Sequence, residues 1–272
     1  MNLIAQKVGN KAYEKYKSAF RHKDIISKFQ AKGEKFVDEE FPPKFSSVSK
    51  TGQHPPEWKG IVFKRATEFM DPSQVRVFRD IDPNDIRQGK LGDCYLLCSL
   101  SVLAEREKLI KRLFITEEAN EVGCYAVWLN DNGAWKSIVV DDYFPCTVNG
   151  GPAFTKTNGD EIWVLLVEKA YAKIYGGYDI IEGGVPPHAL RDLTGAPYDF
   201  LESEDPEEVW RTLKESLSRK YLLTCYTKAT EIREEKNPLG IQSGHAYSIL
   251  DGKEVQTVEG MERIIKIRNP WG

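Results

Sequence analysis

One stretch of the sequence changes from a loop with two glycines into a dense apolar pattern of helical spacing: Gln88-Gly89-Lys90-Leu91-Gly92-Asp93-Cys94-Tyr95-Leu96-Leu97. Asp93 stands at the position of a helix N-cap, so the pattern predicts that Cys94 begins a helix that continues to Ala104. The unsatisfied N–H groups and the positive end of the dipole at a helix N-terminus stabilise a thiolate. Cys94 is therefore a candidate nucleophile.

The loop before this cysteine adds two features that suit acyl chemistry. Gln88, six residues earlier, is placed to donate a side-chain N–H to a developing oxyanion. Gly89 and Gly92 let the backbone turn tightly and let a substrate carbonyl come close. Taken alone, a cysteine in such a helix is more often a buried and inert core residue. The assignment therefore depends on partners elsewhere in the chain.

Two later residues can serve as those partners. His245 begins an alternating strand, and the preceding Gly244 leaves space beside the imidazole. Asn269 ends another apolar strand, because Pro270 cannot continue a ladder of hydrogen bonds. If the two strands pair, the Asn269 amide oxygen can accept an imidazole N–H and fix the tautomer. Each residue alone is more often structural, but Cys-His-Asn is a known variant of the nucleophile, base and orienting group.

Composition excludes several classes of protein. The 272 residues include 38 Lys and Arg and 41 Asp and Glu, for a net charge of −3. This balance argues against nucleic acid or an anionic membrane as the main partner. No signal peptide and no run of about 18 apolar residues is present, so we expect a cytoplasmic chain without a membrane span. An odd number of scattered cysteines predicts reduced thiols: Cys94, Cys98, Cys124, Cys146 and Cys225.

Periodicity predicts a mixture of helices and strands. Alternation predicts strands over 125–129 and 135–140, joined by a tight turn at 131–133. Helical spacing predicts helices over 161–175 and 206–218, and also in the charged first 40 residues. Three further strands are expected: 221–226, 245–250 and 263–268, the last two joined by a polar loop.

Six ordered segments closely resemble the calpain family. The cysteine motif is the stretch 88–97, the histidine motif is 244–248, and the asparagine motif is 265–272; three more are 61–65, 139–142 and 166–173. The resemblance implies an α+β, papain-like core of two lobes, with a cleft between them that binds an extended peptide. We expect a helical N-terminal extension over 1–44, a helical first lobe carrying Cys94 over 45–195, and a β-rich second lobe carrying His245 and Asn269 over 196–272.

The resemblance also implies a Ca²⁺ site in the first lobe. Its carboxylate ligands match Asp85, nine residues before Cys94, and Glu161, just before Trp163. Backbone carbonyls near 79–81 would complete a site of oxygen ligands, which suits a hard cation. In enzymes of this type a tryptophan beside the asparagine shields the Asn-His hydrogen bond from water, and Trp271 matches that position.

The sequence departs from the family pattern at four places. Tyr95 replaces a tryptophan, and Ala196-Pro197 follows Gly195 where a second glycine is common at the hinge. Cys98 replaces an alanine, and we interpret it as a small core residue rather than a metal ligand or resolving thiol. The chain stops at Gly272, the end of the asparagine motif, whereas the second lobe of the family continues well beyond this point. We therefore expect an incomplete second lobe without its own calcium site.

The leading interpretation is a calcium-dependent intracellular cysteine endopeptidase that performs limited proteolysis on protein substrates, with Ca²⁺ as its cofactor. Further C-terminal domains or a regulatory subunit would be partners outside this chain. An alternative is a catalytically inactive scaffold or regulatory fragment, favoured by the incomplete lobe and opposed by the intact Cys94, His245, Asn269 and Gln88. A transglutaminase-like acyltransferase is a third possibility, but such enzymes usually orient the histidine with an aspartate.

Overall fold

The predicted nucleophile helix is present as α4, Cys94–Ala104, and every one of its residues is buried. The computed structural model describes residues 20–156, 158–229 and 236–271. Asp93 is the N-cap residue by position, as predicted, but its side chain caps no helix N–H. The backbone carbonyl of Asp93 accepts the first helix bonds from Leu96 N at 2.8 Å and Leu97 N at 3.1 Å.

The first lobe is built around α6, Trp163–Tyr175, a mostly buried helix that ends at Gly176 in the left-handed conformation. The predicted hairpin is confirmed as β2, Cys124–Asp131, paired with β3, Ala134–Asp141. Its turn places Asn132 and Gly133 at positive φ, which suits a two-residue hairpin turn. A second antiparallel pair joins β1, Val62–Arg65, to β4, Tyr143–Cys146.

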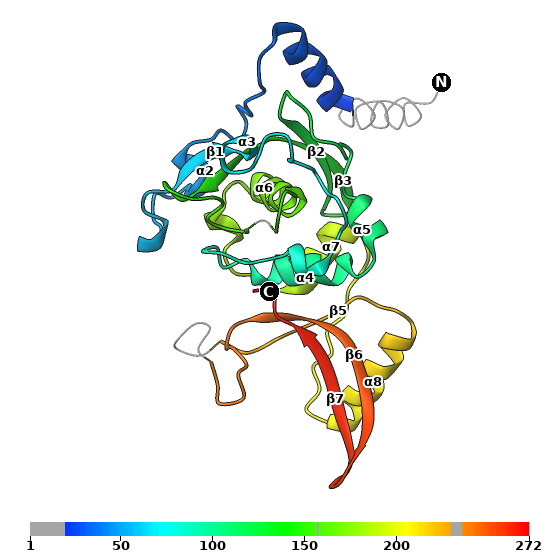
Figure 1. Cartoon of the computed structure of the whole chain (residues 1–272). Coiled ribbons are helices and arrows are strands. Elements are labelled where there is room, and N and C mark those ends of the chain that lie inside the picture. The colour runs from blue at the N-terminus through cyan, green and yellow to red at the C-terminus, as the bar shows by residue number, and fades with distance from the viewer. Residues whose placement is uncertain (1–19, 157, 230–235, 272) are drawn as a thin grey trace, which may run out of the picture.

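Shorter helices complete this lobe, and Figure 1 shows α4 and α7 together on one side of α6. They are α2 Phe45–Val48, η1 Pro56–Trp58, α3 Ala66–Phe69, η2 Pro83–Asp85, α5 Glu107–Lys111, η3 Asp179–Ile181 and α7 Pro186–Thr194. The helix α7 ends at Gly195, whose φ of 69° gives the normal left-handed stop.

The second lobe is a three-stranded antiparallel sheet of order β5-β6-β7 with α8 against it (Figure 1). The helix α8, Pro206–Ser218, has the predicted bounds, and the Asp205 side chain caps it by accepting from Glu207 N at 3.0 Å. The strand β5 is Leu223–Tyr226. The expected polar loop after residue 250 is wrong, because β6, Ala246–Thr257, and β7, Gly260–Arg268, pair from Ser248 opposite Arg268 to Thr257 opposite Gly260. The missed part of β6, residues 251–257, carries mostly polar and charged side chains, so the apolar alternation stops before the strand does.

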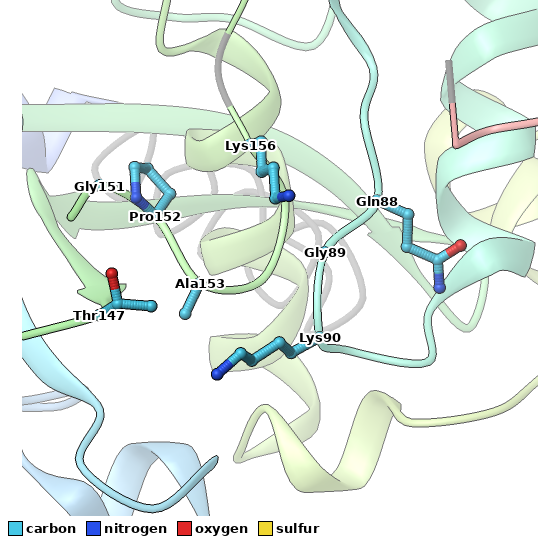
Figure 2. Close-up of a pocket in the computed structure, with 8 residues that line it drawn as sticks. All are labelled: Gln88, Gly89, Lys90, Thr147, Gly151, Pro152, Ala153 and Lys156. Atoms are coloured by element: carbon cyan, nitrogen blue, oxygen red, sulfur yellow. The ribbon is translucent and has the colours of Figure 1, made fainter. Parts of the chain in front are cut away.

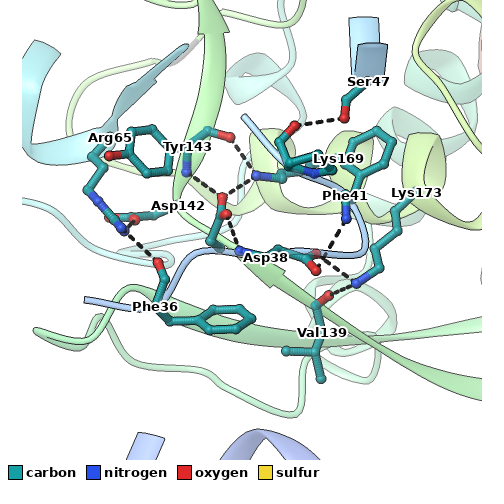
Figure 3. A network of polar contacts seen from close by, with 12 residues as sticks. Phe36, Asp38, Phe41, Ser47, Arg65, Val139, Asp142, Tyr143, Lys169 and Lys173 are labelled. Carbon is teal, nitrogen blue, oxygen red and sulfur yellow. Dashed lines mark hydrogen bonds and ion pairs between the residues drawn. The ribbon is translucent and has the colours of Figure 1, made fainter. Parts of the chain in front are cut away.

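Residues 36–41 pack tightly on the first lobe. Phe36 and Phe41 are buried, and Asp38 lies in the polar network of Figure 3 with Lys173 and the backbone of β3. Residues 20–32 are helical, in agreement with the predicted N-terminal helix, whose earlier part lies outside the described residues. No helix in the described part of the chain is long and apolar enough to cross a membrane. The predicted α+β class is confirmed.

Candidate active site

Cys94 occupies the first position of α4 and is buried. The next residue, Tyr95, packs its ring on the backbone of Gly184, where an added Cβ would lie 2.7 Å from the ring. Ser99 Oγ donates to the Tyr95 carbonyl at 2.7 Å, and to the Pro186 carbonyl at 3.2 Å. These contacts fix the first turn of the helix against the start of α7, so the thiol is held at a rigid helix N-terminus.

His245 and Asn269 are brought together by the second lobe, although 24 positions separate them. His245 precedes β6, and its backbone is tied on both sides to Thr227, through bonds of 3.0 and 3.1 Å. Asn269 follows the end of β7. The antiparallel pairing of the two strands places His245 Nε2 2.9 Å from Asn269 Oδ1. If Nε2 carries the proton, Asn269 orients the ring so that Nδ1 is the nitrogen available for thiol chemistry.

Trp271 covers this pair and joins it to the first lobe. Its ring centroid lies 4.9 Å from that of His245, and its backbone N–H donates to Asn269 Oδ1 at 3.1 Å. Its indole Nε1 donates to Gln88 Oε1 at 3.0 Å. The backbone N–H of Gln88 also donates to the Pro270 carbonyl at 3.0 Å. Trp271 thus lies against the His245–Asn269 pair, and no pattern in the sequence indicated its bond to Gln88.

Gln88 has a second contact that bears on its predicted oxyanion role. Its Nε2 donates to the Leu91 carbonyl at 2.7 Å. An amide nitrogen carries two hydrogens, so one N–H fixes the side chain and the other is the candidate oxyanion donor. Cys98 is a core residue as we interpreted it: it is buried, its Sγ lies 3.4 Å from the Tyr95 carbonyl, and burial raises its pKa.

Gly89 serves packing rather than substrate approach. A Cβ at this position would overlap the Phe154 carbonyl oxygen. The neighbouring backbone is locked to the same segment, because Lys90 N donates to the Ala153 carbonyl at 2.9 Å. A pocket of about 560 Å³ lies between this loop and residues 147–156. In Figure 2 the Gln88 side chain points away from Ala153. Backbone contacts with Ala153 and Phe154 therefore hold one side of the loop that carries Gln88.

The two carboxylates expected to bind Ca²⁺ lie together and are buried. Asp85 Oδ2 accepts a hydrogen bond from Trp163 Nε1 at 3.2 Å. The negative charge of Asp85 also contributes to raising the pKa of Glu161. Burial raises the pKa of Glu161 to about 7, and its Oε2 has no hydrogen-bond partner within the described residues. Its Oε1 accepts from the backbone N–H groups of Arg79 and Asp80, so the loop expected to supply carbonyls is adjacent.

Among the described residues, no three or more His, Cys, Asp and Glu side chains cluster as metal ligands. The Asp85 and Glu161 site would therefore need backbone or water oxygens as well, which Ca²⁺ accepts readily. A buried carboxylate oxygen without a partner, beside a second carboxylate, fits a hard cation. The residues present thus suit the expected metal.

A thiol at a helix N-terminus in one lobe, and in the other a histidine beside a sheet that is hydrogen-bonded to an asparagine, match the groups of the papain-like class of cysteine proteases. Within that class, the chain belongs to the calpain family: the model described as "Calpain family cysteine protease" matches residues 36–272.

Similar proteins come from plants and animals. The calpain-type cysteine protease DEK1 of Arabidopsis thaliana is 35% identical over 263 residues, covering 89% of this chain and 12% of that protein. The calpain-2 catalytic subunit of Bos taurus is 32% identical over 249 residues, covering 88% of this chain and 35% of that subunit. The calpain-1 catalytic subunit of Mus musculus is 34% identical over 247 residues, with 87% and 34% covered. The chain thus spans about a third or less of the length of these relatives.

Proposed function

We propose that this chain forms the core of a calcium-dependent cysteine endopeptidase that cleaves proteins at a limited number of extended sites. The observation that carries the proposal is the 2.9 Å contact between His245 Nε2 and Asn269 Oδ1 beneath Trp271. This contact has the geometry that a catalytic histidine needs to keep one tautomer during proton transfer. Family membership supports the same chemistry.

The proposed reaction uses these groups in the following order. His245 Nδ1 takes the proton of Cys94 Sγ, and the thiolate attacks a peptide carbonyl. The Cys94 backbone N–H and one Gln88 side-chain N–H stabilise the oxyanion. His245 then gives its proton to the leaving amine, and water releases the acyl group from Cys94. Trp271 excludes water from the His245–Asn269 hydrogen bond throughout.

Calcium would be held by Asp85 and Glu161, with carbonyl oxygens of the loop around residues 79–81. When bound, it supplies a charge that neutralises the two buried carboxylates and fixes the loop. Its support is the partnerless Glu161 Oε2 and the raised pKa of Glu161. We also propose a reducing, cytoplasmic location, supported by free thiols at all five cysteines.

The first test is hydrolysis of unfolded casein and labelling by a peptide-like thiol probe, with calcium and with a chelator. Calcium-dependent cleavage together with labelling of Cys94 would support the proposal. If neither occurs at any calcium concentration, the chain by itself does not assemble a working triad, and the scaffold interpretation is preferred only if a chain extended through the rest of the second lobe also fails.

Changing Glu161 to glutamine is expected to weaken calcium binding by at least about tenfold, because a hard cation loses a charged oxygen ligand. Isothermal titration calorimetry measures this directly, without relying on activity. Glu107→Gln, at an exposed position on α5, is the matched control and should leave the affinity unchanged. Equal affinities for wild type and Glu161→Gln would remove this residue from the site.

Changing Gln88 to alanine is expected to lower kcat by about 10²–10³-fold with a smaller change in KM, because a preorganised oxyanion donor acts mainly in the transition state. Steady-state kinetics on a fluorogenic peptide measure the split. The exposed Gln256→Ala is the control. A rise in KM with unchanged kcat would instead assign Gln88 to substrate binding.

A further inference from the structure

A buried hydroxyl joins the strand that follows the histidine to the helix that carries the nucleophile. Ser248 lies on β6, three residues after His245, and is 0% exposed. Its Oγ donates a hydrogen bond of 2.8 Å to the backbone carbonyl of Cys98 on α4. A helical carbonyl uses one lone pair for the helix bond, so the second is open to an outside donor. This bond therefore links the two lobes one helical turn after Cys94.

The residue opposite Ser248 in the sheet contacts the same helix. Arg268 on β7 is the direct ladder partner of Ser248. Residues directly opposite each other in an antiparallel pair direct their side chains to the same face of the sheet. The Arg268 guanidinium forms an ion pair with Glu105, which follows the last turn of α4. One cross-strand pair, immediately before Asn269, thus contacts α4 at two points, where the sheet meets the first lobe in Figure 1.

The alternation of side chains along β6 connects this contact to the histidine. Ala246 and Ser248 share one face of the strand, and Ala246 is 3% exposed within the hydrophobic core that includes α4. Tyr247 lies on the other face, and its ring packs edge-on against His245 with the two ring centroids 5.0 Å apart. The strand is therefore held on α4 by one face and supports the imidazole through the other.

We propose that Ser248 is a positioning residue: its hydrogen bond to α4, assisted by the Arg268–Glu105 ion pair, sets the distance between His245 and Cys94. This proposal rests on the proposed roles of His245 and Cys94. The Ser248 bond contributes more than the ion pair, because it is buried whereas the Glu105 side chain is 42% exposed. A displacement of about 1 Å between reacting groups can lower a rate about 10²-fold, so loss of this bond should reach the chemistry.

The test is cross-linking of Cys94 to His245 by 1,3-dibromoacetone without any substrate. The Cys94 thiolate displaces one bromide, and a His245 ring nitrogen within reach displaces the other, in competition with added small thiol. Mass spectrometry of the peptides gives the ratio of cross-linked to singly alkylated Cys94. In Ser248→Ala this ratio should fall about threefold or more, the factor expected for one lost hydrogen bond. An unchanged ratio in the folded variant would overturn the proposal.

The matched control is Ser101→Ala, the same change on α4 at a residue that is also 0% exposed and whose Oγ has no hydrogen-bond partner within the described residues. Its cross-linking ratio should match wild type, and an equal fall would overturn the proposal. A residue needed only for stability would lower the melting temperature and leave the ratio unchanged. If Ser248→Ala does not fold, the exposed Glu105→Gln replaces it, and its ratio should fall about twofold. No fall in that variant would overturn the proposal.

The outcomes separate this proposal from the proposed function. A wild-type chain that forms the cross-link but does not cleave casein would contradict the endopeptidase proposal alone. A wild-type chain that forms no cross-link would overturn the positioning proposal, because His245 would not lie within reach of the Cys94 thiol, whether or not casein is cleaved.

Discussion

Replacing Cys94 with alanine is expected to lower kcat/KM for peptide hydrolysis by about 10⁴-fold or more, because no covalent intermediate can form. The thiol lies at the N-terminus of a rigid, buried helix, and no other described group is held in an equivalent position. The Cys94 backbone N–H and Gln88 remain in the variant, so the groups proposed to stabilise the oxyanion are unchanged. The measurement is steady-state cleavage of a fluorogenic peptide, with the melting temperature recorded to show that the fold persists.

Cys98→Ala is the matched control for this experiment. Cys98 lies one helical turn further along α4 and is more deeply buried than Cys94, and its pKa is raised by burial. Its replacement removes one sulfur from the core and should change kcat/KM only a few-fold. Activity that survives in Cys94→Ala, or that disappears equally in Cys98→Ala, would show that Cys94 is not the nucleophile.

Replacing Lys169 with methionine is expected to lower the free energy of unfolding by about 3–5 kcal/mol, the usual cost of removing one partner of a buried ion pair. Lys169 is 0% exposed and pairs with Asp141, and its Nζ also donates to the Tyr143 carbonyl at 2.6 Å (Figure 3). Methionine preserves most of the volume, so the loss arises from the Asp141 charge that is left in the core. Urea unfolding monitored by circular dichroism measures the change.

The control for this prediction is Lys111→Met on the surface helix α5. Lys111 forms an exposed ion pair with Glu107 one turn away, and such pairs contribute about 0.5 kcal/mol or less. If Lys169→Met cost no more than this control, Asp141 would have to be stabilised sufficiently by its backbone donors, Asp38 N at 2.7 Å and Tyr143 N at 2.9 Å.

Local elements were the most predictable part of the fold. Short-range chemistry alone fixes the turn at Asn132-Gly133 and the α8 start at Asp205, and the sequence pattern identified both. The continuation of β6 after residue 250 was not predictable, because a β-bulge near Asp251 interrupts the alternation and the residues beyond it are mostly polar or charged. Backbone hydrogen bonds between β6 and β7 continue these strands, and a hydropathy pattern does not reveal such bonds.

The candidate site likewise has a part that the sequence predicts and a part that only the structure shows. The sequence by itself determined which groups are available: a cysteine at a helix start, a histidine before a strand, and an asparagine where Pro270 ends one. These assignments depend on a few neighbouring residues. Only the tertiary structure decided which groups meet. The bond between Trp271 and Gln88 joins residues 183 positions apart, and the Asp93 side chain caps no N–H of its own helix. Contacts between residues so far apart in the sequence depend on how the two lobes pack. Burial and distant hydrogen-bond donors outweigh the local preferences that a sequence pattern records.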